Sequence, residues 1–208
     1  MRKLLQQTLL GVIIGSVERT YKGKGGSPMS SLNLVRWGAI AFMVGGVVWV
    51  LVGFLDVTTG PFIPPGSVAP VLLIVALLLL ALGLVGLHAL QGESYGRIGL
   101  AGLYTALAAI AAQVLGWFVL LAGSTALGWL VSPVGSLATL VGLVLYGAAT
   151  VQARVLPLWY GVLLIVLMPI LLVLGVYGNI WRGLILMVLG YGLWMQRGAS
   201  PERTQRVR

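Results

Sequence analysis

The chain has 208 residues, of which 59% are hydrophobic and only 8% are charged, whereas a soluble domain carries about a quarter charged residues. This composition cannot cover a water-facing surface, so it places the chain in a lipid bilayer. The net charge of +9 would suggest nucleic acid in a soluble protein. Here we attribute it to membrane orientation and to anionic lipid headgroups at the basic termini, with no nucleic-acid partner. The absence of cysteine excludes disulfides, thiolate metal sites and a cysteine nucleophile.

Residues 1–31 are expected to form a cytoplasmic or interfacial segment ahead of the membrane spans. Its apolar stretch, Leu4–Val17, is short for a span and lacks the small-residue cleavage site of a signal peptide. Leu5 and Leu9 fall on one helical face with Val12, which predicts an amphipathic helix at the membrane surface. An equally good alternative is that translation starts at Met29.

Six hydrophobic stretches follow within residues 32–196, and a bilayer crossing needs about 20 apolar residues. They are Val35–Leu55, Val71–Leu90, Ile98–Leu121, Leu130–Val151, Leu156–Val176 and Ile180–Gln196. The loop at 56–70 is rich in proline and is expected to be extended, and Pro169 predicts a kink in the fifth span. A basic cytoplasmic tail, 197–208, closes the chain. The predicted fold class is all-α, a polytopic transmembrane helix bundle of six spans.

Basic residues fall almost entirely on one side of this layout. That side holds Arg2, Lys3, Arg19, Lys22, Lys24, Arg36, Arg97, Arg154, Arg197, Arg203, Arg206 and Arg208. Because basic segments stay in the cytoplasm, both termini are predicted to be cytoplasmic. Arg182 is the one basic residue on the other side, and its side chain is expected to snorkel to the outer interface. Trp49 lies deeper than the other tryptophans and is expected to be a packing residue.

Small side chains recur at steps of three and four residues in three of the spans. The third span has Gly99, Gly102, Ala106, Ala109, Gln113 and Gly116; the fourth has Ser132, Gly135, Thr139, Gly142, Tyr146, Ala149 and Ala153; the first has Gly38, Ala41, Gly45, Val48 and Val52. Such stripes let backbones approach closely in lipid, where no hydrophobic effect drives helices together. They predict a tight bundle whose larger side chains face lipid.

Gln113 is the one long amide placed deep in a span. It could line a substrate path or bind an ion. An interhelical hydrogen bond to Thr139 or Tyr146, worth about 0.6–2 kcal/mol, is favoured. These three residues are the candidate polar contacts within the membrane.

A candidate cytoplasmic elbow is made by the polar residues at two turns. They are His88, Gln91, Glu93 and Arg97 at the first turn and Gln152 and Arg154 at the second. His88 is the only histidine, with too few donors nearby for zinc or haem, so an interfacial or elbow-bonding role is favoured. Glu93 and Arg97 are expected to form an ion pair or cap at a helix start.

No catalytic residue, cofactor or metal is predicted. A hydrolase built from Ser94, His88 and Glu93 is disfavoured because the three crowd one short turn without a G-x-S-x-G elbow. No Asp, Glu or Lys lies mid-membrane in the predicted layout, and no nucleotide-binding fingerprint occurs.

The segment Gly147–Ile165, GAATVQARVLPLWYGVLLI, resembles a pattern in small, uncharacterised, multi-spanning bacterial inner-membrane proteins. In these proteins a helix ends in a short basic turn before an L-P-x-W entry to the next helix. The resemblance covers under a tenth of the chain. It implies a multi-pass protein of the bacterial plasma (inner) membrane and carries no activity or site residue.

Together these features predict a non-enzymatic integral membrane protein that acts by helix association, as a subunit, stabiliser or assembly partner of a membrane complex. Its partners would be other membrane subunits or further copies of itself. The alternative is a carrier or binder of a neutral or lipid-like small molecule, with a path lined by Gln113, Thr139, Tyr146 and the Pro169 kink. That alternative requires a polar or roomy cavity at mid-depth. An intramembrane enzyme ranks third.

Overall fold

The computed structural model describes residues 28–59, 68–92, 94–123 and 125–196. These residues form α2 (Pro28–Thr59), α3 (Ala69–Gln91), α4 (Gly96–Leu121), α5 (Thr125–Ala153), α6 (Leu158–Val166), α7 (Pro169–Leu174), the 3₁₀ helix η1 (Gly175–Tyr177) and α8 (Gly178–Gln196). The all-α prediction is confirmed for this part of the chain. The expected interfacial helix of the N-terminal segment, most of the proline-rich loop, Glu93 and the basic tail lie outside the described residues.

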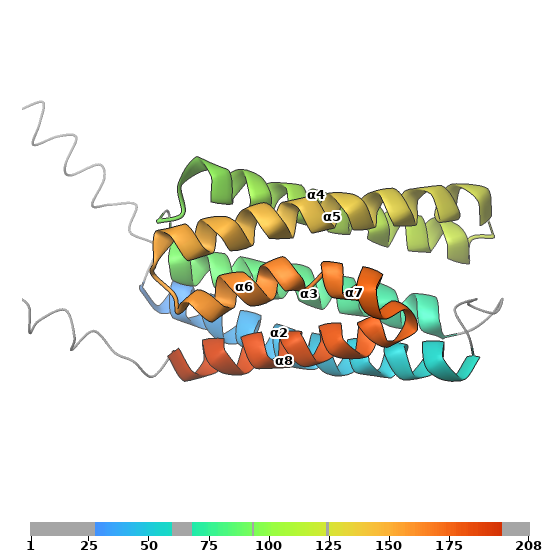
Figure 1. Cartoon of the computed structure of the whole chain (residues 1–208), viewed down its shortest axis with the longest axis horizontal. Helices are drawn as coiled ribbons and strands as arrows, with labels where there is room; N and C mark the ends of the chain where they lie inside the picture. Colours follow the sequence, from blue (N-terminus) through green and yellow to red (C-terminus); the bar gives the residue numbers. More distant parts are fainter. Residues whose placement is uncertain (1–27, 60–67, 93, 124, 197–208) are drawn as a thin grey trace, which may run out of the picture.

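Four of these helices are long and apolar enough to cross a membrane, by length and composition. The four candidate spans are Asn33–Thr59, Ala69–Gln91, Gly96–Leu121 and Pro133–Ala153. The structure therefore fits an integral membrane protein. The helices run back and forth along one long axis, with α4 and α5 on one edge, α2 and α8 on the other, and α3 and α6–α7 between them (Figure 1).

Two of the helices extend beyond the predicted spans. α2 begins at Pro28, inside the predicted N-terminal segment, and ends at Thr59, inside the predicted extended loop. Proline is tolerated there because the N–H groups of a first helical turn have no intrahelical acceptor. At the other end, the hydroxyl of Thr59 donates a hydrogen bond to the Leu55 carbonyl at 2.8 Å. α5 begins at Thr125, more than a turn ahead of the predicted start at Leu130.

The predicted kink at Pro169 is a complete break. α6 ends at Val166, residues 167 and 168 form a turn, and α7 begins at Pro169. Because proline has no N–H and its ring crowds the preceding turn, the Ile165 carbonyl loses its helical donor. Up to that point α6 is regular, since the Leu167 N–H donates to the Leu163 carbonyl at 2.9 Å.

The three predicted small-residue stripes lie at two helix interfaces. α4 packs on α5, and a Cβ added to Gly142 would lie 2.5 Å from the Ala106 backbone nitrogen. α2 packs on α3, where a Cβ on Gly38 would lie 2.5 Å from the Gly86 Cα. All six stripe positions of α4 are buried. The side chain of Ser132 in the α5 stripe lies outside the described residues.

A further close interface, between α2 and α8, was not predicted. A Cβ on Gly46 would lie 2.5 Å from the Gly183 carbonyl oxygen, and a Cβ on Gly190 would lie 2.7 Å from the Ala39 carbonyl oxygen. The contacting small residues recur every seven positions, as Ala39 and Gly46 on α2 and as Gly183 and Gly190 on α8. This heptad spacing keeps one seam of each helix against its partner.

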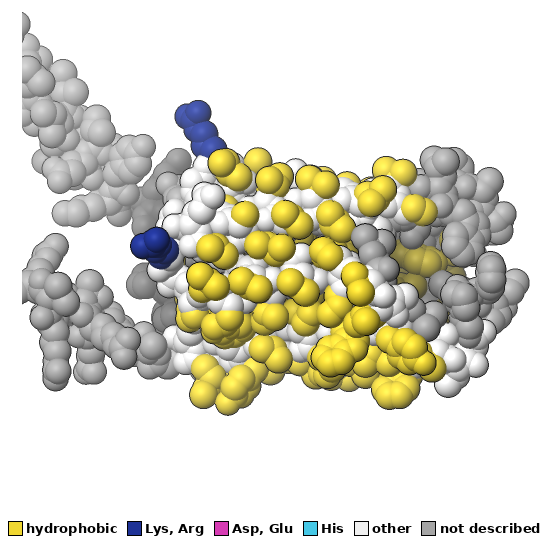
Figure 2. Space-filling view, in the orientation of Figure 1, with side chains coloured by type: hydrophobic (Ala, Val, Ile, Leu, Met, Phe, Trp, Pro, Cys, Tyr) yellow, Lys and Arg dark blue, Asp and Glu magenta, His cyan; other side chains and the backbone are white. Residues whose placement is uncertain are grey.

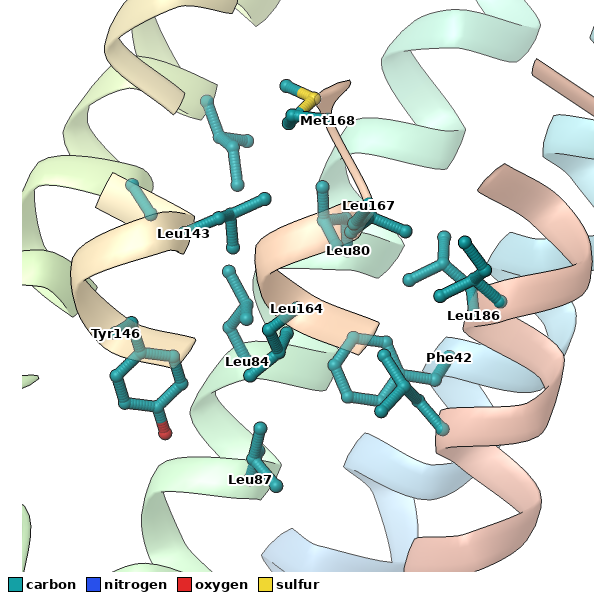
Figure 3. Packing of buried hydrophobic residues seen from close by; sticks show 14 of the residues in the cluster. Phe42, Leu80, Leu84, Leu87, Leu143, Tyr146, Leu164, Leu167, Met168 and Leu186 are labelled. Carbon is teal, nitrogen blue, oxygen red and sulfur yellow. The ribbon is translucent and has the colours of Figure 1, made fainter. Parts of the chain in front are cut away.

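The centre of the bundle is filled with large apolar side chains. Figure 3 shows ten of them converging: Phe42, Leu80, Leu84, Leu87, Leu143, Tyr146, Leu164, Leu167, Met168 and Leu186. The break between α6 and α7 turns Leu167 and Met168 into this cluster, and both are buried. On the outside, hydrophobic side chains cover the length of the face in Figure 2, and Lys or Arg side chains are visible only at one end of it.

Candidate functional site

A buried arginine lies where α2, α8 and the α6–α7 break meet. Arg182, in the second turn of α8, is only 5% exposed. Its Nη2 atom donates to Met168 Sδ at 2.9 Å, and its Cζ lies 4.4 Å from the centroid of the Trp49 ring, within cation–π range. Trp49 is buried, as expected for a packing residue.

The expectation that Arg182 snorkels to the outer interface is wrong. Its neighbour Gly183 lies directly against Gly46 of α2, so the two backbones are too close for the long side chain to turn outward between them. Arg182 is instead held between Trp49 and Met168. The glycine seam and the helix break together bury a charged group, and arginine is almost never fully buried unless it is paired, so this residue is a functional candidate.

The charge of Arg182 is not balanced by an acidic side chain within the described residues. Asp56 is the only acidic residue among them, and its Oδ2 accepts a hydrogen bond from Asn179 Nδ2 at 2.6 Å. Arg182 Nε and Trp49 Nε1 are buried and have no hydrogen-bond partner. A buried guanidinium without a partner costs several kcal/mol. The site therefore presents a positive charge and two free N–H donors.

The predicted contact of Gln113 with Thr139 is present. Gln113 Nε2 donates to Thr139 Oγ1 at 2.7 Å, and Gln113 Oε1 accepts from Ser136 Oγ at 3.2 Å. Thr139 Oγ1 in turn donates to the Gly135 carbonyl at 2.9 Å. Both ends of the Gln113 amide are thus engaged within the α4–α5 pair, as a polar contact that holds the helices together.

Tyr146, the third candidate polar contact, belongs to a different cluster. Its ring meets Tyr95 edge to face, with centroids 5.4 Å apart and an interplanar angle of 84°. Its hydroxyl is buried and has no hydrogen-bond partner. Gln113 and Tyr146 therefore belong to separate groups, and Leu143, which lies between Thr139 and Tyr146 along α5, is buried in the apolar cluster.

The structure joins two residues of the predicted cytoplasmic elbow, His88 and Gln91, to Tyr95 in the same turn and to Thr150 of α5. The Tyr95 hydroxyl is hydrogen-bonded to His88 Nδ1. Gln91 Nε2 donates to Thr150 Oγ1 at 3.1 Å, which ties the end of α3 to α5. Ser94 Oγ donates to the Gln91 carbonyl at 2.7 Å instead of to His88. The favoured elbow-bonding role of His88 therefore has a structural basis.

The remaining elbow residues lie apart from this cluster. Arg97, Gln152 and Arg154 are exposed. Arg154, directly after the last residue of α5, has φ 52°, in the left-handed region. Helices commonly end with a residue in this conformation. Glu93 lies outside the described residues, so its expected pairing with Arg97 stays a prediction.

The buried arginine site was missed, although two sequence signals pointed to it. The seven-residue spacing of small residues in the first and last spans, Ala39 and Gly46 in one and Gly183 and Gly190 in the other, indicated a close helix pair. Arg182 directly precedes one of those glycines and follows Asn179 by three residues, so it falls at the edge of the same interface. Among the described residues, no group of three His, Cys, Asp or Glu side chains is placed to hold a metal ion.

No protein-family model, curated protein or solved structure matches this chain.

Proposed function

We propose that the protein is a six-pass membrane protein with both termini in the cytoplasm, that it is not an enzyme, and that it acts by lateral association with another transmembrane helix. Four helices supply the first spans. The chain from α6 to η1 and then α8 each extend along the same axis in opposite directions, which supports two further crossings (Figure 1). The pattern at Gly147–Ile165 supports a bacterial plasma membrane.

Charge placement supports the proposed orientation. The exposed residues Arg97 and Arg154 lie at the elbows that begin α4 and end α5, and these elbows share one end of the bundle with the start of α2 and the end of α8. Basic side chains are retained on the cytoplasmic side during insertion. This end is therefore assigned to the cytoplasm.

The cysteine-free chain allows a direct test of the topology. Single cysteines replace Ser94 and Val155 at one end and Tyr177 at the other, all of them exposed positions. A membrane-impermeant maleimide added to intact cells is expected to label Tyr177→Cys, and to label Ser94→Cys and Val155→Cys only after the membrane is opened. Labelling of Tyr177→Cys only after opening would remove the last two crossings, and labelling of Ser94→Cys in intact cells would reverse the orientation.

The observation that carries the association proposal is a second stripe of small residues on α4, facing away from the bundle. It consists of Ala101, Thr105, Ala108 and Ala112, spaced by four, three and four residues. The first three are exposed and the fourth is half-buried, and α4 is the least buried of the four candidate spans. The inner face of the same helix uses the same spacing to pack against α5. The outer stripe is therefore suited to a second close helix contact.

Cross-linking in the membrane tests this association. Ala108→Cys is expected to form a discrete cross-linked species under mild oxidation or with a short bismaleimide, whereas Leu137→Cys, exposed on α5, is expected to form none. Ala108→Trp, which fills the small-residue face, is expected to reduce the mass of the native complex in mild detergent. A monomer whose mass is the same with and without Ala108→Trp, and whose Ala108→Cys variant yields no cross-link, would contradict the proposal.

If the protein is instead a carrier or binder, its ligand site lies beside Arg182 and not along Gln113 and Tyr146. The interior at mid-depth holds close-packed residues such as Leu84, Leu143 and Leu164, none of them more than 2% exposed, which disfavours the path past Gln113 and Tyr146. Transporter sites are typically formed where membrane helices are broken. The α6–α7 break beside Arg182 is the one observation that favours binding, and it favours an anion over a neutral molecule.

A further inference from the structure

Three helical segments create a small donor-only site around Arg182. α2 contributes Trp49, the α6–α7 break contributes Met168, and α8 contributes Arg182. Among the described residues, the side-chain acceptor that Arg182 contacts is the thioether sulfur of Met168, which is a weak one. Arg182 Nε and Trp49 Nε1 remain without acceptors. The group therefore has no strong acceptor and no negative charge of its own.

The one acidic side chain among the described residues, that of Asp56, is already engaged by Asn179. Asp56 lies two turns after Trp49 on α2, so both fall on the face toward α8. Its carboxylate accepts from Asn179 at 2.6 Å, and no ion pair joins it to Arg182 within the described part of the chain. The Arg182 side chain is almost completely removed from solvent. Desolvation of that kind is tolerated when a partner charge is present.

We propose that this site binds a small monovalent anion, of halide or formate size, between the Arg182 guanidinium and the Trp49 indole N–H. The two groups are adjacent, since the Cζ of Arg182 lies 4.4 Å from the Trp49 ring centroid. N–H donors around a fixed positive charge recognise an anion by charge-assisted hydrogen bonds. Both side chains are buried, Arg182 at 5% and Trp49 at 3% exposed, which favours a small ligand over a phosphate or a lipid headgroup. This inference is independent of the outer stripe of α4.

The test measures the thermal midpoint of the full-length protein in detergent as bromide replaces gluconate at constant ionic strength. Bromide is a small monovalent anion, whereas gluconate is a bulky one. A ligand that binds only the folded protein raises its stability by an amount that grows with ligand concentration over Kd. The wild-type midpoint is therefore expected to rise with bromide once the concentration exceeds Kd.

Three variants assign the effect to the site. Arg182→Met removes the charge with little change in length, and it is expected to abolish the bromide dependence. Trp49→Phe keeps the ring face and removes the N–H, and it is expected to raise the bromide concentration needed by about tenfold, which is the equivalent of one hydrogen bond to a charged group. Arg97→Met, at an exposed elbow position, is expected to keep the full wild-type response. If Arg182→Met does not fold, Trp49→Phe and Arg97→Met still decide the question.

Two results would overturn the proposal. An equal bromide response in wild type, Trp49→Phe and Arg182→Met would identify a general salt effect. No bromide response in wild type would mean that the folded protein has no such anion site, and a new response in Asp56→Asn would then show that the Asp56 carboxylate neutralises Arg182. An unchanged bromide response in Asp56→Asn supports the proposal.

Discussion

Gln113 and Thr139 are joined by a hydrogen bond of 2.7 Å across the α4–α5 interface, and both side chains are buried. The bond lies on the same faces that bring Gly142 against Ala106, so close backbone packing and a polar contact reinforce each other. In lipid, neither term is assisted by the removal of apolar surface from water. The stability of this helix pair therefore depends on fit and on a small number of polar contacts.

The hydrogen bond between Gln113 and Thr139 should be measurable as a coupling energy. In a double-mutant cycle, Gln113→Met and Thr139→Val are expected to couple by about 0.6–1.7 kcal/mol, because each change removes one partner of the same bond. Reversible unfolding in bicelles provides the free energies. Pairing Gln113→Met with Tyr104→Phe, at an exposed position on the same helix, is expected to give no coupling. A coupling energy of zero in the first cycle would show that the bond contributes nothing.

The α4–α5 contact should not tolerate a methyl group at its closest point. Gly142→Ala is expected to cost about 1–3 kcal/mol, because the new Cβ would lie 2.5 Å from the Ala106 nitrogen and the helices would have to move apart. The thermal midpoint in detergent is the measurement. Val141→Ala changes the neighbouring exposed residue and is expected to leave the midpoint almost unchanged. Equal midpoints for the two variants would refute the close contact.

The α2–α8 seam should contribute independently of the α4–α5 contact. Gly183→Ala places a Cβ 2.4 Å from the Gly46 carbonyl oxygen, so it is expected to be destabilising on its own. The two interfaces belong to different helix pairs. The double variant Gly142→Ala and Gly183→Ala is therefore expected to show additive losses, within about 0.5 kcal/mol. A strongly non-additive result in the same unfolding assay would mean that the two helix pairs form one cooperative interface.

The cytoplasmic elbow should depend on Tyr95 in two separable ways. Tyr95→Phe removes the hydrogen bond to His88 and keeps the edge-to-face contact with Tyr146, so it is expected to cost about 0.5–1.5 kcal/mol. Tyr95→Ala also removes the aromatic pair and is expected to cost at least about 0.5–1.5 kcal/mol more. Tyr104→Phe, at an exposed tyrosine of α4, is the control and is expected to have no effect. Equal losses from Tyr95→Phe and Tyr104→Phe would argue against the elbow bond.

Several features were predictable because they depend on local chemistry. Pro169 lacks an N–H wherever it lies, so an interruption at that residue follows from its identity alone. The stripe from Gly99 to Gly116 follows from helical periodicity, which places residues three and four apart on one face. The hydrogen-bond partner of the Gln113 amide could be limited to Thr139 or Tyr146, because the partner had to lie on the facing small-residue stripe of the fourth span. Only Thr139 accepts, since Tyr146 turns to Tyr95.

Composition alone shows that the chain is too apolar for water, and the 3.6-residue period shows which faces of α4 and α5 carry the small side chains that let them meet. The packing of α8 on α2 could not be read in this way. Several helices carry glycine-bearing faces, and the choice among them depends on contacts between residues far apart in the chain. That pairing carried Arg182 inward to Trp49 and Met168. A charge counted as exterior in the linear order thus became the most deeply buried cation of the described residues.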